Sequence, residues 1–258
     1  MTTNLSSPLF VVLGAPDHEM QEIRRVCREE GIAHSFATRF GSMVRSEDAY
    51  SATDVRGGIP PGSRVIFVEC LVMGLACDEV IDHHNEGDPG YGKTPEQYLE
   101  GSSLGQFLAR IGKEPTHQQR LIAAADHCLA AAYQGRCPGV FPDELQAWRE
   151  ATRSVARSLS LPDLQRQIQD AVAALAAAPR INLAGCDVAW FEEGPPAEAS
   201  EASARTGVPY AYVRKEQNGQ VKSGIRSAPP AAIQCWLERC GLKRTYGDPQ
   251  RGFAGGYF

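Results

Sequence analysis

The amino-acid sequence predicts an α/β fold with a parallel-sheet N-terminal domain, a helical connector and a smaller mixed-sheet C-terminal domain. Three observations carry this prediction. Short apolar runs alternate with helical patterns in the first part of the chain, apolar residues then recur at helical spacing from Ser102 to Ala178, and strand patterns return after Pro179. Strands that alternate with helices at short intervals are typical of a parallel sheet with helices on both faces.

The N-terminal part begins with an apolar strand at residues 8–14, followed by a helix that Pro16 opens and Gly31 ends. Within this helix, Met20, Ile23 and Val26 recur at the period of one buried helical face. Three further strands are predicted at residues 32–38, 63–69 and 79–81.

Four helices are predicted next, at residues 102–111, 116–133, 142–159 and 161–178. The last has Ser160 as its N-cap and Pro162 in its first turn, and its alanine-rich end would make a stiff connector. The C-terminal part combines strands at 180–191, 208–214 and 220–225, an Asn218-Gly219 hairpin turn, helices at 197–205 and 231–240, and a glycine-rich tail at 246–258. The predicted domains are residues 1–155, a connector at 156–180, and residues 181–258.

The composition is that of a globular chain of 258 residues, with 43% hydrophobic and 22% charged residues. Its net charge of −5 excludes a global basic field that would hold a long polyanion, but it is compatible with a small anionic substrate. The eight cysteines include no C-x-x-C pair, which favours free thiols. Because the sequence also shows no export signal and no membrane-length apolar run, we expect a cytoplasmic protein.

The tripeptide Asp82-His83-His84 is the most informative local feature. It follows a short apolar run and precedes a polar, glycine-rich stretch, so it lies where a predicted strand ends. Imidazole and carboxylate are good ligands for Mn²⁺, Fe²⁺ or Zn²⁺. Two interpretations are open at this point: a metal-ligand set, or a loop whose histidines satisfy local hydrogen bonds.

Further carboxylates follow other predicted strands. Asp17 and Glu19 come after the first strand, Glu69 ends the third, and Asp126 lies among small apolar residues of a helix. Each has an ordinary explanation, as a helix N-terminal acid, a solvated side chain or an ion-pair member. Because parallel sheets place ligand sites at the carboxyl ends of their strands, the combination favours a shared metal site.

The order of these residues resembles the DHH phosphoesterase superfamily, which includes RecJ-type exonucleases, oligoribonucleases that degrade very short RNA, and family II pyrophosphatases. Gly101-Ser102-Ser103 is similar to the start of a small-residue helix in that family. The C-terminal segments Val221-Lys222-Ser223-Gly224-Ile225-Arg226-Ser227 and Arg251-Gly252-Phe253-Ala254-Gly255-Gly256 are similar to its associated domain. The resemblance covers most of the chain.

The first motif departs from the family pattern. Leu13 stands where the family has a histidine, Glu19 and Glu69 stand where it has aspartates, and Arg251 replaces the histidine of its glycine-rich C-terminal motif. His18 could substitute for the missing imidazole, but its side chain is expected to point in a different direction from that of position 13. One of the two family metal sites therefore keeps only Asp17 and Glu69.

The resemblance implies a divalent metal, with Mn²⁺ favoured and one ion favoured over two. Its ligands are expected among Glu19, Glu69, His83 and Asp126. Asp82 is also expected to bind metal, and Asp17 is expected to be a ligand of a weakly bound second ion. His84 and Arg251 would stabilise phosphoryl charge. A flexible tail with solvated arginines is the ordinary interpretation of the C-terminus, whereas the resemblance implies that it binds substrate through Arg226, Gly252, Gly255 and Gly256.

The predicted function is metal-dependent hydrolysis of a short oligonucleotide or a nucleotide-like phosphoester. The alternative is a catalytically degenerate family member that binds a nucleotide or a protein partner without turnover, for which Leu13 and the two glutamate replacements are the evidence. Hydrolysis of a different bond on the remodelled site is a third interpretation. We expect a small phosphorylated substrate or short nucleic acid and no membrane, and a homodimer is left open.

Overall fold

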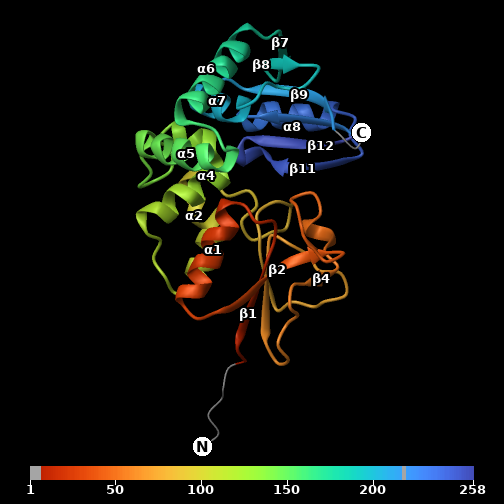
Figure 1. The fold of residues 1–258 in the computed structure, drawn as a ribbon. Coiled ribbons are helices and arrows are strands. Elements are labelled where there is room, and N and C mark those ends of the chain that lie inside the picture. The colour runs from red at the N-terminus through yellow and green to blue at the C-terminus, as the bar shows by residue number, and fades with distance from the viewer. Residues whose placement is uncertain (1–6, 217–218) are drawn as a thin grey trace, which may run out of the picture. The chain divides into compact units, whose positions relative to one another are not determined.

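A computed structural model describes residues 7–216 and 219–258, and the chain divides into two compact units. The first unit comprises Met1–Tyr91 and Leu99–Ala123, and the second comprises Gly92–Tyr98 and Ala124–Phe258. Each unit is built on its own sheet, one mostly parallel and one mixed (Figure 1). The predicted α/β fold class is confirmed, while the predicted boundaries at 155 and 180 stay predictions.

The sheet of the first unit has the order β3-β2-β1-β5-β6, with β4 paired to β2. The pairs β1–β2, β1–β5 and β5–β6 are parallel, and β3 and β4 pair antiparallel with β2. The four predicted strands are confirmed to within one residue. The strands are β1 (Leu9–Leu13), β2 (Ala33–Arg39), β3 (Ser42–Met43), β4 (Asp54–Val55), β5 (Arg64–Val68) and β6 (Glu79–Ile81).

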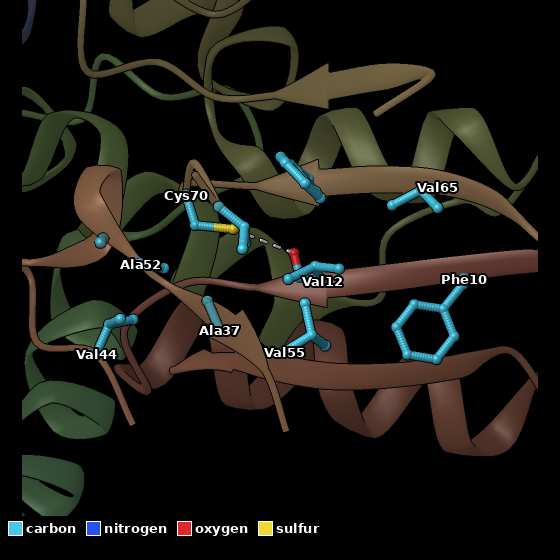
Figure 2. Close-up of a cluster of buried hydrophobic side chains, with 11 residues drawn as sticks. Phe10, Val12, Ala37, Val44, Ala52, Val55, Val65 and Cys70 are labelled. Atoms are coloured by element: carbon cyan, nitrogen blue, oxygen red, sulfur yellow. Dashed lines mark hydrogen bonds between the residues drawn. The ribbon is translucent and has the colours of Figure 1, made fainter. Parts of the chain in front are cut away.

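Alternating side chains of the central strands fill the core of this unit. Figure 2 shows one cluster, in which Phe10 and Val12 of β1 point to the same side as Val65 of β5, and the Cys70 thiol donates to the Val12 carbonyl oxygen at 3.6 Å. The intervening residue Val11 is fully buried on the opposite side of the sheet. The helical elements of this unit are α1 (His18–Glu29), η1 (Ala49–Ser51), α3 (Ser103–Arg110) and the beginning of α4 (His117–Tyr133).

Helix α1 begins two residues later than predicted. Asp17 is its N-cap and accepts a hydrogen bond from the Met20 amide at 2.9 Å, so Pro16 lies outside the helix. Helix α3 has Ser102 as its N-cap, with the hydroxyl accepting from the Gly105 amide at 3.1 Å. The two helices contact each other, and both begin at the carboxyl edge of the parallel strands.

The sheet of the second unit has the order β11-β12-β10-β9-β8-β7, in which only β8 and β9 are parallel among the described pairs. Apolar residues of α6 and α7 pack on one face, and those of α8 pack on the other. The helical elements are η2 (Pro95–Gln97), α2 (Tyr98–Gly101, shared with the first unit), α5 (Pro142–Arg157), α6 (Leu161–Ala177), α7 (Ala199–Thr206), α8 (Pro230–Arg239) and η3 (Pro249–Arg251). The strands are β7 (Arg180–Leu183), β8 (Cys186–Phe191), β9 (Tyr210–Lys215), β10 (Val221–Arg226), β11 (Arg244–Asp248) and β12 (Phe253–Tyr257).

Two C-terminal segments differ from their predictions. Residues 180–191 form a hairpin instead of one strand, because Ala184 and Gly185 both adopt positive φ. The glycine-rich tail is ordered as the antiparallel pair β11–β12, so the flexible-tail interpretation is wrong. The predicted Asn218-Gly219 turn includes Asn218, which lies outside the described residues. Among the described helices, none is long and apolar enough to span a membrane.

A buried network of ion pairs joins α5 and α7. Glu201 is fully buried and accepts from Arg149 at 2.7 Å and from Arg205 at 3.1 Å, and the Tyr133 hydroxyl also donates to it. Burial raises the pKa of the Glu201 carboxyl, but the charge of Arg149 and the hydrogen bonds from Tyr133 and Arg149 outweigh it and hold the pKa below its ordinary value. The carboxylate is therefore ionised in the folded protein.

We expect Glu201→Gln to lower the free energy of unfolding by about 3 kcal/mol at pH 7, because it leaves Arg149, which is 14% exposed, without its counter-charge. A depressed pKa stabilises the fold above the ordinary value of 4.5 and loses that effect as pH falls through the lower folded value. The difference between the two proteins should therefore shrink below pH 4.5, as measured by urea unfolding across pH. Asp163→Asn, at an exposed pair with Arg166, is the control and should change little. An equal difference at every pH would contradict the assignment.

Candidate metal centre

The first unit brings carboxylates and imidazoles together at the carboxyl edge of its parallel strands. Glu69 directly follows β5, His83 and His84 follow β6, and Glu19 lies in the first turn of α1 after β1. Ligand atoms of Glu69, His83 and His84 lie within 4.8 Å of one another, and the same limit holds for Glu19, Glu69 and His83. Parallel strands end at one edge of a sheet, so residues distant in sequence meet there.

The ring of His83 is held in one orientation. Its side chain is fully buried, and Nδ1 lies 3.0 Å from the Gly101 carbonyl oxygen. Since a carbonyl only accepts, Nδ1 carries the proton and Nε2 is the nitrogen that faces Glu69 Oε1, at 3.2 Å. This is the arrangement of a metal-binding histidine, whose second nitrogen is oriented by a backbone carbonyl.

Neighbouring residues make room for this ring. A Cβ atom at Gly90 would lie 2.8 Å from the His83 Cβ and 2.1 Å from the Gly101 oxygen, so only glycine fits there. The Gln106 amide donates to the carbonyl oxygens of Asp82 at 3.1 Å and Gly101 at 3.0 Å. The chain after β6 and the turn before α3 are thereby fixed to each other.

Glu69 holds its position at a conformational cost. Its φ is +49°, in the left-handed region that non-glycine residues seldom adopt, and its side chain is 9% exposed. The backbone is held there from both sides, since the Glu69 amide donates to the Ile81 carbonyl at 3.0 Å and the Gly14 amide donates to the Val68 carbonyl at 2.9 Å. Strained backbone at a buried carboxylate is typical of functional sites.

Asp82 orients the histidines through hydrogen bonds. Its carboxylate accepts from the His83 amide at 2.7 Å, from His84 Nδ1 at 2.9 Å, and from the Tyr50 hydroxyl at 2.8 Å and 3.1 Å. Burial raises the pKa of Asp82, but hydrogen bonding and charge from His84, together with Tyr50, outweigh it and keep the pKa below its ordinary value. Asp82 is absent from the ligand groups found among the described residues, and metal binding by Asp82 stays a prediction.

Glu19 and Asp17 have different environments. Glu19 is 1% exposed, and its Oε1 accepts from the Leu104 amide at 2.9 Å, at the N-terminus of α3. The positive end of that helix favours the ionised carboxylate. Asp17 is exposed and caps α1, so its expected role toward a second ion stays a prediction.

The remaining predicted residues belong to the second unit. Arg251 Nε donates to the His127 carbonyl at 2.9 Å, and Nη2 lies 3.1 Å from the carbonyl and 3.5 Å from the carboxylate of Asp126. These carbonyls face Arg251 where Cys128 (φ −153°, ψ 54°) interrupts α4. The Arg251 side chain is 3% exposed and contacts the Asp126 carboxylate. The expected role of Arg251 toward phosphoryl charge and that of Asp126 as a ligand stay predictions.

The C-terminal glycines have a packing role. Gly252 has φ +80° after η3, and a Cβ at Gly255 would lie 2.6 Å from the Tyr246 hydroxyl. Arg226 is partly exposed, and its guanidinium lies 5.6 Å from the centre of the Phe253 ring. Phosphate binding by Arg226, Gly252, Gly255 and Gly256 stays a prediction.

Sequence reasoning missed Tyr50, Gly90 and Gln106. Tyr50 lies on the short helical turn η1 and reaches a carboxylate 32 residues further along the chain. Its neighbour Ala49 accepts from the Leu71 amide at 3.0 Å, which holds the turn. No spacing rule connects these positions. Gly90 and Gln106 lie near the recognised tripeptide and turn, but only the packing around His83 gives them a role.

No protein-family model matches this chain, and no curated protein matches it either. Among solved structures, the chain is similar to a pGpG-specific phosphodiesterase, PggH from Vibrio cholerae, with 10% sequence identity and a TM-score of 0.35. The match covers 98% of this chain and 93% of that one. A likeness of this size leaves the function to be argued from the residues of this chain.

We expect Glu69→Asn to keep the free energy of unfolding within about 1 kcal/mol of wild type, or to raise it, because asparagine tolerates positive φ better than glutamate. Ala184→Asn, at φ +49° in the β7–β8 turn, is the matched control that measures the conformational gain alone. Urea unfolding compares the two. A loss of about 3 kcal/mol or more at position 69, with a gain at position 184, would show that the Glu69 carboxylate stabilises the fold instead of serving a ligand.

Proposed function

We propose that this protein is a metal-dependent hydrolase of a small phosphoester, with a short oligonucleotide or a nucleotide-like molecule as substrate. The observation that carries the proposal is the group formed by Glu19, Glu69 and His83, whose ligand atoms lie within 4.8 Å of one another at the carboxyl edge of the sheet. All three are at most 7% exposed, so the group is shielded from water.

The donor set fits a divalent ion. Without a proton on Nε2, His83 and the Glu69 carboxylate would both be acceptors there, and acceptors 3.2 Å apart need a positive charge near them. Carboxylate oxygens with one imidazole suit Mn²⁺, Fe²⁺ or Zn²⁺, and we propose Mn²⁺. A bound divalent ion in such a site supplies a hydroxide nucleophile at neutral pH and neutralises phosphoryl charge.

The proposed ligands are Glu19, Glu69 and His83, and the resemblance of the sequence adds Asp126 as a fourth. We propose one bound ion and not two because Leu13, which is fully buried in β1, has no ligand atom. Asp17, the other carboxylate considered for a second ion, caps α1 instead. One ion is therefore better supported than two.

His84 is the proposed contact to the phosphoryl group. Its Nδ1 is 2.9 Å from Asp82, which fixes the ring and leaves Nε2 on the other side, and its side chain is 35% exposed. The Tyr50 hydroxyl also donates to Asp82, and the Tyr50 ring lies edge-on to His84, with centroids 6.3 Å apart. His84 can therefore contact a substrate while its ring is held in one orientation.

A nucleotide-binding protein without turnover is the second candidate. Leu13 removes an imidazole, and one Glu19 oxygen already accepts from the Leu104 amide at 2.9 Å, which leaves less of that carboxylate for an ion. A substitution of this kind weakens a site whose chemistry depends on positions held to about an ångström. Nucleotide binding without hydrolysis favours this candidate.

We expect the purified protein to contain a divalent ion and to hydrolyse bis-p-nitrophenyl phosphate or short RNA in the presence of Mn²⁺. His83→Ala should lower metal affinity and turnover by about 100-fold or more, since loss of even an orienting partner costs 10–100-fold. His34→Ala is the control, because His34 lies on β2 and contacts the Ile32 carbonyl. Metal analysis and initial rates measure both effects. If there is neither metal nor turnover and His83→Ala equals wild type, the enzyme proposal fails.

A further inference from the structure

One face of the second sheet carries aromatic rings beside cations. In the register of β9, β10, β12 and β11, the row Tyr212, Gly224, Gly255 and Tyr246 crosses all four strands. The neighbouring row contains Arg214, Lys222 and Tyr257 at equivalent positions. Side chains two residues apart along a strand point to the same face, so both rows share one surface.

The two glycines allow the tyrosine rings to lie over the strands. A Cβ at Gly224 would lie 3.0 Å from the Tyr212 ring, and a Cβ at Gly255 would lie 2.7 Å from the Tyr246 ring. Both glycines lie inside strands, where glycine otherwise weakens a sheet. Their place directly beneath aromatic rings explains them: the rings cover the backbone as a flat surface.

Helices α6 and α7 cover one end of this face only. Tyr210 and Tyr212 of β9 are buried in the cluster that these helices form. Lys222, Tyr246 and Tyr257 lie beyond that cluster and are partly exposed. These three residues are termed the aromatic–basic face.

The lysine of this face is placed between the two rings. Its Nζ lies 5.6 Å from the centroid of Tyr246 and 5.5 Å from that of Tyr257, within the range of a cation–π contact. Among the described residues, no carboxylate lies within ion-pair distance of Lys222. Arg214, the next cation in the row, pairs with Glu216 at 2.7 Å. Lys222 therefore keeps its charge available for a ligand.

We propose that the aromatic–basic face binds a nucleotide, with the base stacked on Tyr257 or Tyr246 and the phosphate held by Lys222. Partly exposed aromatic rings beside a cation without a carboxylate partner offer what a nucleotide requires: a stacking surface for the base and a charge for the phosphate. The net charge of −5 belongs to the whole chain and does not describe this face, where lysine lies between two neutral rings. The role of the face in positioning a substrate rests on the proposed hydrolase function, whereas nucleotide binding itself does not.

Binding is tested with wild-type protein in EDTA, so that neither bound metal nor hydrolysis contributes. The probes are adenosine 5′-monophosphate, adenosine and ribose 5-phosphate, titrated by calorimetry. We expect the monophosphate to bind about tenfold more tightly than ribose 5-phosphate, because stacking supplies the difference. Equal affinity of these two probes, or no binding of any probe, overturns the proposal.

Variants locate the site. Tyr257→Leu should weaken binding of adenosine 5′-monophosphate about tenfold, and Tyr257→Phe should leave it within about twofold, because phenylalanine keeps the stacking surface. Lys222→Gln should weaken the monophosphate and leave adenosine unchanged. Lys215→Gln is the control, since Lys215 is exposed on β9 and its position alternates to the other face.

The outcomes separate this inference from the hydrolase proposal. If nucleotide binding depends on Tyr257 and the protein shows no turnover, the proposed binding face is supported and the proposed hydrolase function is refuted. Turnover with equal affinity in Tyr257→Leu and Tyr257→Phe refutes the face and leaves the hydrolase standing. Circular dichroism of each variant checks that the fold is kept. If Tyr257→Leu unfolds, Lys222→Gln gives the decisive comparison, because only a phosphate contact predicts weaker binding of the monophosphate with unchanged binding of adenosine.

Discussion

The candidate metal centre depends on the close approach of two chain segments, one leaving β1 and the other leaving β5. The Gly14 backbone lies so near Glu69 that an added Cβ would be 2.4 Å from the Glu69 carbonyl oxygen. Glu69 at this point has φ +49°, and its amide donates to the Ile81 carbonyl at the end of β6. A glycine on one strand and a strained glutamate on the other are therefore two parts of one arrangement, and the position of the carboxylate relative to His83 follows from it.

The orientation of His83 bears on the two interpretations that the tripeptide left open. A histidine that only satisfied local hydrogen bonds would direct both nitrogens at groups of matching polarity. Here Nδ1 is taken by the Gly101 carbonyl, and Nε2 faces the Glu69 carboxylate at 3.2 Å. That contact is favourable only with a second proton on the ring or a cation nearby. Glu19 adds a second buried carboxylate to the same small volume, and this increases the need for a positive charge there.

Much of the fold was predictable, and the reasons differ between elements. The parallel strands and α1 follow from apolar periodicity and from Gly31, and they fix the edge where Glu69 and His83 appear. The β7–β8 hairpin was missed although Gly185 is a turn residue, because Ala184 beside it seldom adopts positive φ and a lone glycine is also compatible with a continuous strand. The hydrogen bond from Tyr50 to Asp82 could not be predicted for a different reason. The two residues are 32 positions apart, and their contact depends on backbone hydrogen bonds that hold η1.

Leu13 weakens the enzyme interpretation less than the sequence alone suggests. Its side chain is fully buried in the sheet, where it contributes to core packing and offers no ligand atom. The other potential ligands of the first unit remain within 4.8 Å of one another, two of them as buried carboxylates. Like charges that are buried together repel strongly unless a positive charge joins them, and Glu69 adds the cost of a left-handed backbone. A site that binds no cation would have nothing to offset these costs, whereas a bound cation would offset the repulsion between the carboxylates directly.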